Sequence, residues 1–272
     1  MATAGPIAHA TLIIADATPL VRAYAALGVV VLKRSSIDAA TAQRWRQPQL
    51  AGAAVTEIGT YGSTLLRLIE QPQVTARPTR YGHGWLALEI LVRDVDALAA
   101  PAAAAGFEIV GAPADLELSP HLRAMQLVGP AGEMLYLTQV KAPVPPFDLP
   151  LSTGIDPEHN VGRLFIAVMS TPSRDAVINA CAHLDARACL QFETKVTVLN
   201  RALGRAINTR WPLATLQWAG ASLFEIDEVI DDQVARAHEG TMPMGLAWVS
   251  MQGGEADALR EVSPGAWLEM LG

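Results

Sequence analysis

The sequence predicts an α+β fold built from repeated units, and three observations support this. First, a short strand that ends in Asp, a helix of small residues and a Gly occur in this order at residues 9–28 and again at 87–106. Second, each copy is followed along the chain by a further apolar strand, at 62–72 and 132–139. Third, four Pro residues fall within 142–150, where they exclude a continuous helix and favour an extended connector.

The first two copies define the unit. In the first, the apolar run His-Ala-Thr-Leu-Ile-Ile-Ala predicts a strand that ends at Asp16, and residues 17–28 predict a helix. In the second, a strand over 87–94 ends at Asp94 and a helix follows over 95–106. A phrase that recurs with the same order of elements indicates a repeated structural module, here strand, helix and further strands.

The second half of the chain contains a third copy. Residues 160–170 predict a strand, and 171–184 predict a helix that begins with a Thr cap and a Pro at its first position. Two stretches rich in strand-forming residues follow at 196–199 and 214–218, and the closing strand is expected at 221–227.

A fourth copy is shortened. Residues 244–251 predict its strand, 255–261 a short helix and 265–271 its closing strand, with no room for two middle strands. We therefore expect two tandem domains joined by a Pro-rich linker: an N-terminal domain of two modules over 1–141, the linker over 142–159 and a C-terminal domain over 160–272.

Composition bounds the class of protein. With 272 residues, 51% hydrophobic and 17% charged, the chain can bury one large or two medium cores. Its 20 basic and 27 acidic residues give a formal charge of −7, which disfavours nucleic acid as a partner. The sequence has no apolar run of the roughly 18 to 20 residues that span a bilayer and no signal-peptide pattern, so we expect no membrane partner and a cytoplasmic location.

The repeated unit resembles the βαβββ module of the vicinal oxygen chelate superfamily, which includes glyoxalase I, extradiol dioxygenases, fosfomycin resistance proteins and bleomycin-binding proteins. The resemblance covers residues 7–140 and extends more loosely beyond residue 160. It implies that paired modules form curved mixed sheets around a cup that holds a small molecule. Since one cup serves many reactions, the resemblance points to a fold more than to a chemistry.

The resemblance also implies where a metal would bind. Metal-dependent members place ligands on the first and closing strands of each module, with the first-strand ligand seven residues before the Asp. Only one of these positions in the N-terminal half offers a metal donor, because the four are His9, Ala87, Arg67 and Tyr136. A guanidinium has no lone pair to give and a divalent ion needs three or more donors, so we expect no metal cofactor in this cup.

What remains in the N-terminal cup is a ring of polar residues suited to binding and proton transfer. Arg67 is expected to hold a carboxylate or enolate by paired hydrogen bonds, while His9 and Tyr136 move protons. The segments that lead into and out of the strands add four expected substrate-binding residues, namely Tyr61, Arg80, Tyr81 and His83.

Two glutamates take the closing-strand positions of the C-terminal half. Glu225 and Glu269 are expected to work as an acid and base pair. The first-strand positions there are Arg163 and a residue near Met244 or Gly245. Two carboxylates with no His form a poor site for zinc or iron, although a divalent metal stays open as an alternative.

The leading hypothesis is a metal-independent isomerase or lyase for a small oxygenated compound, either aromatic or a hydroxy-carbonyl. The first alternative is a protein that sequesters a small molecule without chemistry. The second is a metal-dependent extradiol dioxygenase or glyoxalase, which requires His83 or His121 to lie beside His9 and a carboxylate. Because the shortened fourth module leaves a sheet edge uncovered, we also expect a homodimer.

Overall fold

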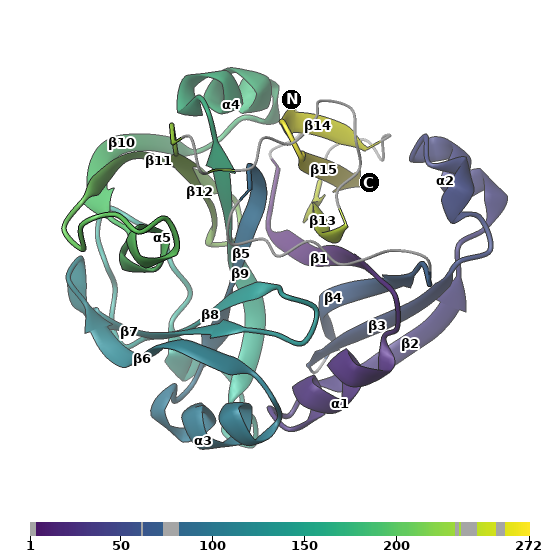
Figure 1. Cartoon of the computed structure of the whole chain (residues 1–272), viewed down its shortest axis with the longest axis horizontal. Helices are drawn as coiled ribbons and strands as arrows, with labels where there is room; N and C mark the ends of the chain where they lie inside the picture. Colours follow the sequence, from purple (N-terminus) through teal and green to yellow (C-terminus); the bar gives the residue numbers. More distant parts are fainter. Residues whose placement is uncertain (1–3, 61, 73–81, 232–233, 235–243, 254–258) are drawn as a thin grey trace.

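The fold consists of two curved mixed β-sheets with helices packed against them (Figure 1). The computed structural model describes residues 4–60, 62–72, 82–231, 234, 244–253 and 259–272. The seven-stranded sheet has the order β14-β15-β13-β1-β4-β3-β2, and the eight-stranded sheet the order β10-β11-β12-β9-β5-β8-β7-β6. The predicted α+β fold of curved mixed sheets is confirmed.

The elements of the first two modules follow the predicted order. The first module contains β1 (Ile7–Ile14), α1 (Thr18–Ala25), β2 (Val30–Ser36), α2 (Ala39–Arg44), the 3₁₀ turn η1 (Pro48–Leu50), β3 (Ala54–Thr60) and β4 (Ser63–Glu70). The second contains β5 (Gly84–Val92), α3 (Asp96–Ala104), β6 (Glu108–Leu116), β7 (Ser119–Val128) and β8 (Met134–Val140).

The last two modules begin after the Pro-rich connector and a 3₁₀ turn, η3 (Ser152–Gly154). The third module contains β9 (Val161–Thr171), α4 (Arg174–Cys181), η4 (Ala182–Leu184), β10 (Ala188–Lys195), α5 (Thr197–Ala202), β11 (Arg210–Trp218) and β12 (Ser222–Glu228). The fourth contains β13 (Gly245–Gln252), β14 (Arg260–Ser263) and β15 (Ala266–Leu271).

One predicted element differs, and another lies largely outside the described residues. The stretch 196–199, expected as strand, forms the start of the short helix α5. The helix expected over 255–261 falls largely outside the described residues, and its last part belongs to β14. At 196–199, strand-forming residue types were outweighed by the position of the segment in the module.

The modules pair across the predicted linker and not within each half of the chain. In each module the first and closing strands are parallel neighbours, as β1 is to β4 and β5 to β8. Two modules then meet through antiparallel first strands: β1 pairs with β13, and β5 with β9. The first module therefore shares a sheet with the fourth, and the second with the third. The domain boundaries at 142–159 stay a prediction.

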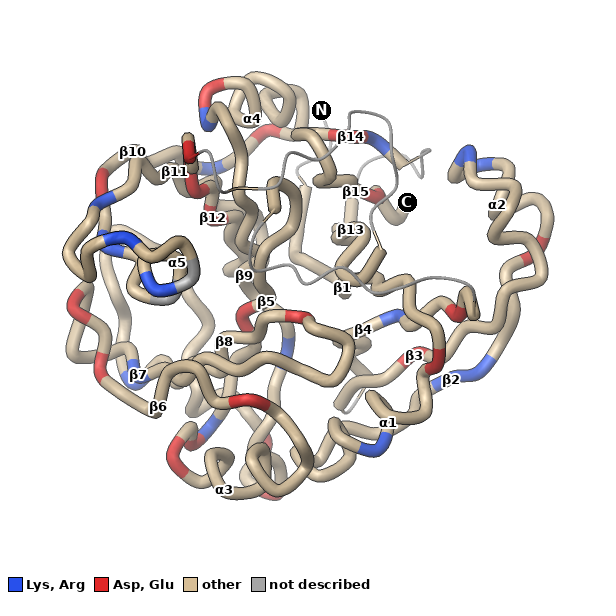
Figure 2. The backbone as a smooth tube through the Cα atoms, viewed as in Figure 1, with Lys and Arg blue, Asp and Glu red and all other residues tan. Residues whose placement is uncertain are grey.

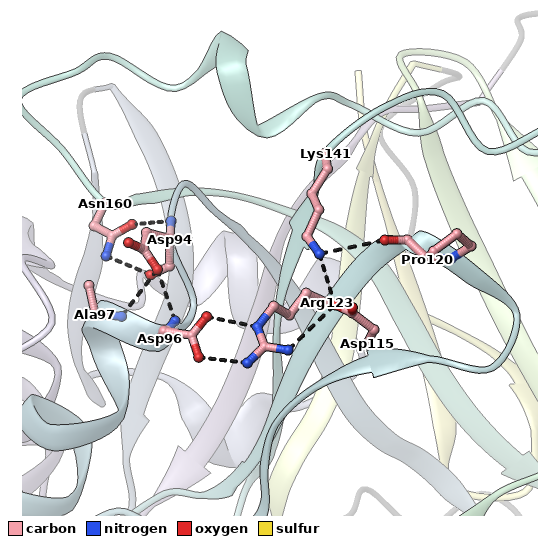
Figure 3. Close-up of polar contacts among 8 residues, drawn as sticks. All are labelled: Asp94, Asp96, Ala97, Asp115, Pro120, Arg123, Lys141 and Asn160. Carbon is pink, nitrogen blue, oxygen red and sulfur yellow. Dashed lines mark hydrogen bonds and ion pairs between the residues drawn. The ribbon is translucent and has the colours of Figure 1, made fainter.

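The Asp of the repeated sequence motif lies at the end of the strand and caps the start of the helix. The Asp16 carboxylate accepts a hydrogen bond of 2.8 Å from the backbone N–H of Thr18. In the second module, Asp94 accepts one of 3.0 Å from the N–H of Asp96, and the side chain of Asn160 holds the Asp94 backbone (Figure 3). Short polar side chains satisfy the free N–H groups at a helix start, which explains why the phrase recurs.

The main core lies between the two sheets and leaves their inner, concave faces apart from it. It joins residues of both sheets with the buried faces of α1, α3 and α4. The inner face of the seven-stranded sheet has its own apolar cluster around Ile13 and Trp248, and the eight-stranded sheet has another around Phe165 and Val168. Each sheet therefore has an apolar cluster of its own on its inner face.

An insertion covers each concave side at the same place in the topology. In the first module, α2 and η1 lie between β2 and β3, and Trp45 and Leu50 belong to the inner apolar cluster of that sheet. In the third module, α5 lies between β10 and β11, where Leu199 packs with Trp211. Figure 1 places α2 by the seven-stranded sheet and α5 by the eight-stranded one.

Charged residues of both signs are distributed over many elements of the chain (Figure 2). Lys and Arg residues are spread over helices and strands of both sheets and do not gather on one element. The edge strand β2 of the first module exposes Val30, Val31 and Leu32, at the opposite end of the sheet from the fourth module. The uncovered edge expected at the shortened fourth module and the homodimer stay predictions. Among the described residues, no helix is both long and apolar enough to cross a membrane.

Candidate functional site

The inner face of the seven-stranded sheet carries a polar cluster, which we call the first cup. His9 on β1 lies opposite Ser250 on β13, and Ser250 in turn lies opposite Glu269 on β15. Arg67 on β4 completes the group, since its side chain reaches Glu269. The first cup comprises His9, Trp45, Arg67, Trp248, Ser250 and Glu269.

Glu269 is the centre of the first cup and is fully engaged. Its Oε2 accepts hydrogen bonds from Arg67 Nη1 at 2.9 Å and from Ser250 Oγ at 2.6 Å, and a longer one from Trp248 Nε1 at 3.3 Å. Its Oε1 accepts one from Trp45 Nε1 at 2.8 Å. Burial alone would raise the pKa of this carboxyl, but Arg67 and the hydrogen bonds lower it below its usual value. Glu269 is therefore an ionised and poorly basic carboxylate.

His9 is a neutral imidazole at physiological pH. Its side chain is buried, and Nε2 has no hydrogen-bond partner. Burial, the largest cause, and the positive charge of Arg67 together lower the pKa of His9 to about 3, and Glu269 only partly opposes them. A ring with this pKa is a weak base, so His9 is better suited to a polar contact than to proton transfer.

The inner face of the eight-stranded sheet carries a different cluster, which we call the second cup. Glu89 on β5 lies opposite Tyr136 on β8, and Thr138 Oγ1 donates a hydrogen bond of 2.5 Å to Glu89 Oε1. Glu225 and Asp227 on β12 are two residues apart and so share one face of that strand. The second cup comprises Glu89, Tyr136, Thr138, Glu225 and Asp227.

The acids of the second cup hold protons far more tightly than free carboxyls do. Burial raises the pKa of Glu89 to about 8, with a smaller contribution from the charge of Glu225 and an opposing one from the Thr138 hydrogen bond. Burial also raises the pKa of Glu225 to about 7, and burial together with Glu225 raises that of Asp227 well above its usual value. Because the groups interact, they titrate as a cluster.

Tyr136 stays protonated beside these acids. Burial raises the pKa of its phenol well above the usual value, and the charges of Glu225, Asp227 and Glu89 raise it further. Tyr136 and Glu225 are half-buried, whereas Glu89 and Asp227 are buried. Tyr136 and Glu225 are therefore the more accessible of these four side chains.

The second cup contains acids without a matching cation. Within the described ranges, no Lys, Arg or His is among the groups that shift the pKa of Glu89, Tyr136, Glu225 or Asp227. Asp227 is completely buried, and neither of its carboxyl oxygens has a hydrogen-bond partner. The first cup, by contrast, balances Glu269 with Arg67.

Comparison with known proteins identifies the fold. No family model and no curated protein matches the sequence. Among solved structures, glyoxalase I from Zea mays superposes with a TM-score of 0.57 at 14% identity, over 94% of this chain and 76% of that chain. A candidate dioxygenase from Bacillus subtilis subsp. subtilis str. 168 gives a TM-score of 0.60 at 9% identity, over 98% of this chain and 86% of that chain. The chain has the vicinal oxygen chelate fold. At these identities the likeness concerns the fold alone.

Within this vicinal oxygen chelate fold, the predicted site residues divide between the two cups. Arg67, His9 and Glu269 come together in the first cup, and Tyr136 and Glu225 in the second. The predicted ring of His9, Arg67 and Tyr136 is therefore wrong as a single site, and so is the pairing of Glu225 with Glu269. The reason is the pairing of modules across the linker, which combines closing strands from opposite halves of the chain.

Four further residues were expected to bind substrate. Tyr61, Arg80 and Tyr81 lie outside the described residues. His83 precedes β5, and its Nε2 forms a hydrogen bond of 3.1 Å with the carbonyl oxygen of Val229. His83 therefore belongs to the end of the eight-stranded sheet and not to the cup of His9.

Sequence reasoning missed several residues of both cups. The first-strand position of the fourth module is Ser250, and that of the third is Val168, because these residues pair with the first strands of the other modules. Arg163, expected at that position, instead donates to the carbonyl oxygens of Gly220 and Ala221. The remaining missed residues are Trp45, Glu89, Thr138, Asp227 and Trp248. Strand alternation offered a signal for Asp227, which lies two residues beyond Glu225.

The residues present do not fit the divalent metal that many proteins of this fold use. The four ligand positions hold His9, Arg67, Ser250 and Glu269 in the first cup, and Ala87, Tyr136, Val168 and Glu225 in the second. In the described part of the chain, no three His, Cys, Asp or Glu side chains are placed to share a metal ion. His121 lies exposed on β7 and does not supply the second histidine ligand that the hypothesis of a metal-dependent enzyme requires.

Proposed function

We propose that the protein is an enzyme that moves protons on a small oxygenated organic compound, as an isomerase or lyase, and that the second cup is its active site. The observation that carries the proposal is the group of three carboxyls, Glu89, Glu225 and Asp227, around the phenol of Tyr136. The fold supports it, because proteins of this fold place small ligands on the concave face of the sheet.

The acidity of the cluster suits general acid–base catalysis. An efficient catalytic acid or base has a pKa near the working pH, so that both protonation states are populated. The pKa of about 7 for Glu225 meets this condition, and Glu225 keeps part of its surface exposed. Glu89 is buried and has a pKa of about 8, so it can supply a further proton to the cluster. Glu225 is therefore our candidate for the group that touches the substrate.

Tyr136 is suited to stabilise charge on the substrate. Its pKa is raised well above the usual value, so its hydroxyl remains a hydrogen-bond donor at neutral pH. In the proposed step, the Glu225 carboxylate takes a proton from a carbon next to a carbonyl, and the C–H electron pair moves into an enolate. Tyr136 donates a hydrogen bond to the enolate oxygen.

The same intermediate leads to both reaction classes. In an isomerase, protonated Glu225 returns the proton to the neighbouring carbon, so that no atom is gained or lost. In a lyase, the electron pair of the enolate expels a leaving group, which takes the proton from the carboxyl cluster. Neither path needs a metal, oxidant or reductant.

The test is exchange of carbon-bound hydrogen in D₂O, followed by proton NMR with chelator present. We would use a panel of aromatic and hydroxy-carbonyl compounds. The proposal expects exchange or conversion of at least one compound by the unmodified protein and a loss of 100-fold or more in E225Q, since the amide cannot take the proton. E193Q is the matched control, because Glu193 is an exposed acid on β10 of the same sheet. Equal rates in E225Q and E193Q would contradict the proposal.

The first cup favours a second candidate function, the binding of a small molecule without chemistry. Arg67 retains some exposure beside the unpaired Nε2 of His9, and the guanidinium can hold an anion. Calorimetric titration with small carboxylates tests this role in R67M. Saturable binding by the unmodified protein that R67M loses, with no conversion of any compound in the NMR panel, would favour sequestration over catalysis.

A further inference from the structure

We propose that the second cup binds a ligand that carries an ammonium group, and that Asp227 and Glu225 pair with this cation. The inference rests on the proposed function only in placing the ligand in the same cup. It concerns recognition and does not depend on whether a reaction follows.

The first argument is the state of Asp227. Its side chain is completely buried and both carboxyl oxygens lack a partner. A buried polar group without a hydrogen bond destabilises the folded protein, and a charged one does so more strongly. Folded proteins rarely retain such a group without a use for it, and a ligand that brings N–H donors would satisfy both oxygens.

The second argument is the missing cation. In the first cup, Arg67 lies 2.9 Å from Glu269 and neutralises it. In the second cup, no basic side chain within the described ranges acts on Glu89, Glu225 or Asp227. The two sheets share the order of their first and closing strands, so the contrast identifies the charge that the second cup lacks. A positively charged ligand would supply it.

The third argument concerns the spacing of the acids. The carboxyls interact strongly enough to shift one another's pKa, yet among the described residues no three acids are close enough to hold a bare metal ion. An ammonium nitrogen presents three N–H donors in separate directions and can therefore bridge acids that stand further apart. An organic cation fits this spacing better than a metal.

The walls of the cup suit the carbon part of such a ligand. Ile166 and Val168 on β9 and Leu223 on β12 lie on the same inner face as the acids and belong to its apolar cluster. The ring of Tyr136 adds an aromatic surface, and a cation near such a ring gains a further attraction. At pH 8, where Glu225 with its pKa of about 7 is largely ionised, an anionic ligand would meet negative charge at the same place, so it should be rejected.

The experiment compares charge at constant shape. Binding to the full chain is measured by calorimetry at pH 8 with chelator present, using three matched sets of probes: benzylamine, benzyl alcohol and benzoate, then the phenethyl and the 4-hydroxyphenethyl series. We expect at least one amine to bind 10-fold or more tightly than its alcohol, and its carboxylate to bind no better than the alcohol. If no amine exceeds its alcohol, the inference is overturned.

Two variants test whether the ligand's ammonium group binds at Asp227 and Glu225. D227N and E225Q should each reduce the preference for the amine at least 10-fold, while E193Q keeps it. If D227N does not fold, E225Q alone decides, because Glu225 is half-buried and Gln has the same shape. An unchanged preference in E225Q overturns the inference, as does stabilisation by Mn²⁺, Mg²⁺ or Ca²⁺ with no effect of any amine in chelator-free buffer. Amine binding without hydrogen exchange would support this inference and contradict the proposed function. Hydrogen exchange without a preference for amines would support the proposed function and contradict this inference.

Discussion

The indole N–H of Trp45 donates a hydrogen bond of 2.8 Å to Glu269 Oε1, although the two residues are 224 positions apart in the sequence. Trp45 follows α2, the insertion between β2 and β3, whereas Glu269 lies on the closing strand of the last module. The Arg67 guanidinium lies 5.4 Å from the centre of the Trp45 ring, within cation–π distance. The insertion is therefore fastened to the first cup by the same carboxylate that holds Arg67.

We predict that Trp45→Phe loosens this insertion without unfolding the protein. Phe keeps most of the apolar contact with Trp248 but cannot donate to Glu269. A hydrogen bond to a charged group contributes about 1.5–3 kcal/mol, so the free energy of unfolding should fall by that order. Hydrogen–deuterium exchange should accelerate over residues 39–50 and stay unchanged in β10. Uniform acceleration across both sheets would contradict a local role.

The Arg67–Glu269 pair should behave as a coupled, buried pair. Removing one partner leaves an uncompensated charge, so we expect R67M to lose about 3–5 kcal/mol of stability. The double variant R67M/E269Q should lose clearly less than the sum of the two single variants. Urea unfolding of all four proteins gives the coupling energy.

The matched control is an exposed pair with good geometry. Arg123 donates two hydrogen bonds of 2.7 Å to the carboxylate of Asp96 at the surface (Figure 3). Exposed pairs of this kind contribute about 0.2–1 kcal/mol. The same cycle on R123M and D96N should therefore give a small coupling energy. A larger value at the surface pair than at Arg67–Glu269 would count against our account of the first cup.

Stability should fall as the pH rises from about 4.5 to about 8. The pKa values of Glu89 and Glu225 are about 8 and 7 in the folded protein, above the usual 4.5. The folded state therefore holds protons that the unfolded chain has released, and rising pH favours unfolding. Urea unfolding at pH 5.5 and pH 8.5 measures the effect, and E89Q should reduce the difference. A protein that is equally stable at both values would contradict the raised pKa values.

A buried contact joins the first and second modules. The Tyr24 hydroxyl on α1 donates a hydrogen bond of 3.0 Å to Glu133 Oε1, and both side chains are buried. Tyr24→Phe removes the donor and should lower the free energy of unfolding by about 1–3 kcal/mol, because the Glu133 oxygen loses its partner. Thermal unfolding followed by circular dichroism checks this, with the exposed variant E193Q expected to melt like the unmodified protein.

The modules themselves could be predicted from the sequence because their signals are local. Asp16 and Asp94 end a strand and start a helix by contacts within three residues, so the phrase recurs wherever the unit does. The partner of each module could not be predicted in this way. Each first strand is apolar and offers a similar edge, and only the pairing of β1 with β13 decides that Arg67 meets Glu269.

The positions of five candidate residues on the inner faces could be predicted from the sequence, but the way they group could not. His9, Arg67, Tyr136, Glu225 and Glu269 all lie on the inner faces, as their positions on first and closing strands indicated. Their grouping depends on contacts between different modules, such as that of Arg67 with Glu269, 202 positions apart, which no local pattern encodes. Asp227 was missed for a different reason, since its burial without a partner is visible only in the folded protein.

The most direct test of the central claim is a pH titration of the Asp and Glu side-chain carboxyl carbons by carbon-13 NMR, with E89Q and E225Q used to assign the signals. The account predicts that at least two carboxyls titrate between pH 6 and pH 9, and that E225Q removes one of these transitions and shifts the others to lower pH. If every carboxyl has titrated by pH 5, the second cup holds no protons at neutral pH and the proposed proton transfer there is contradicted.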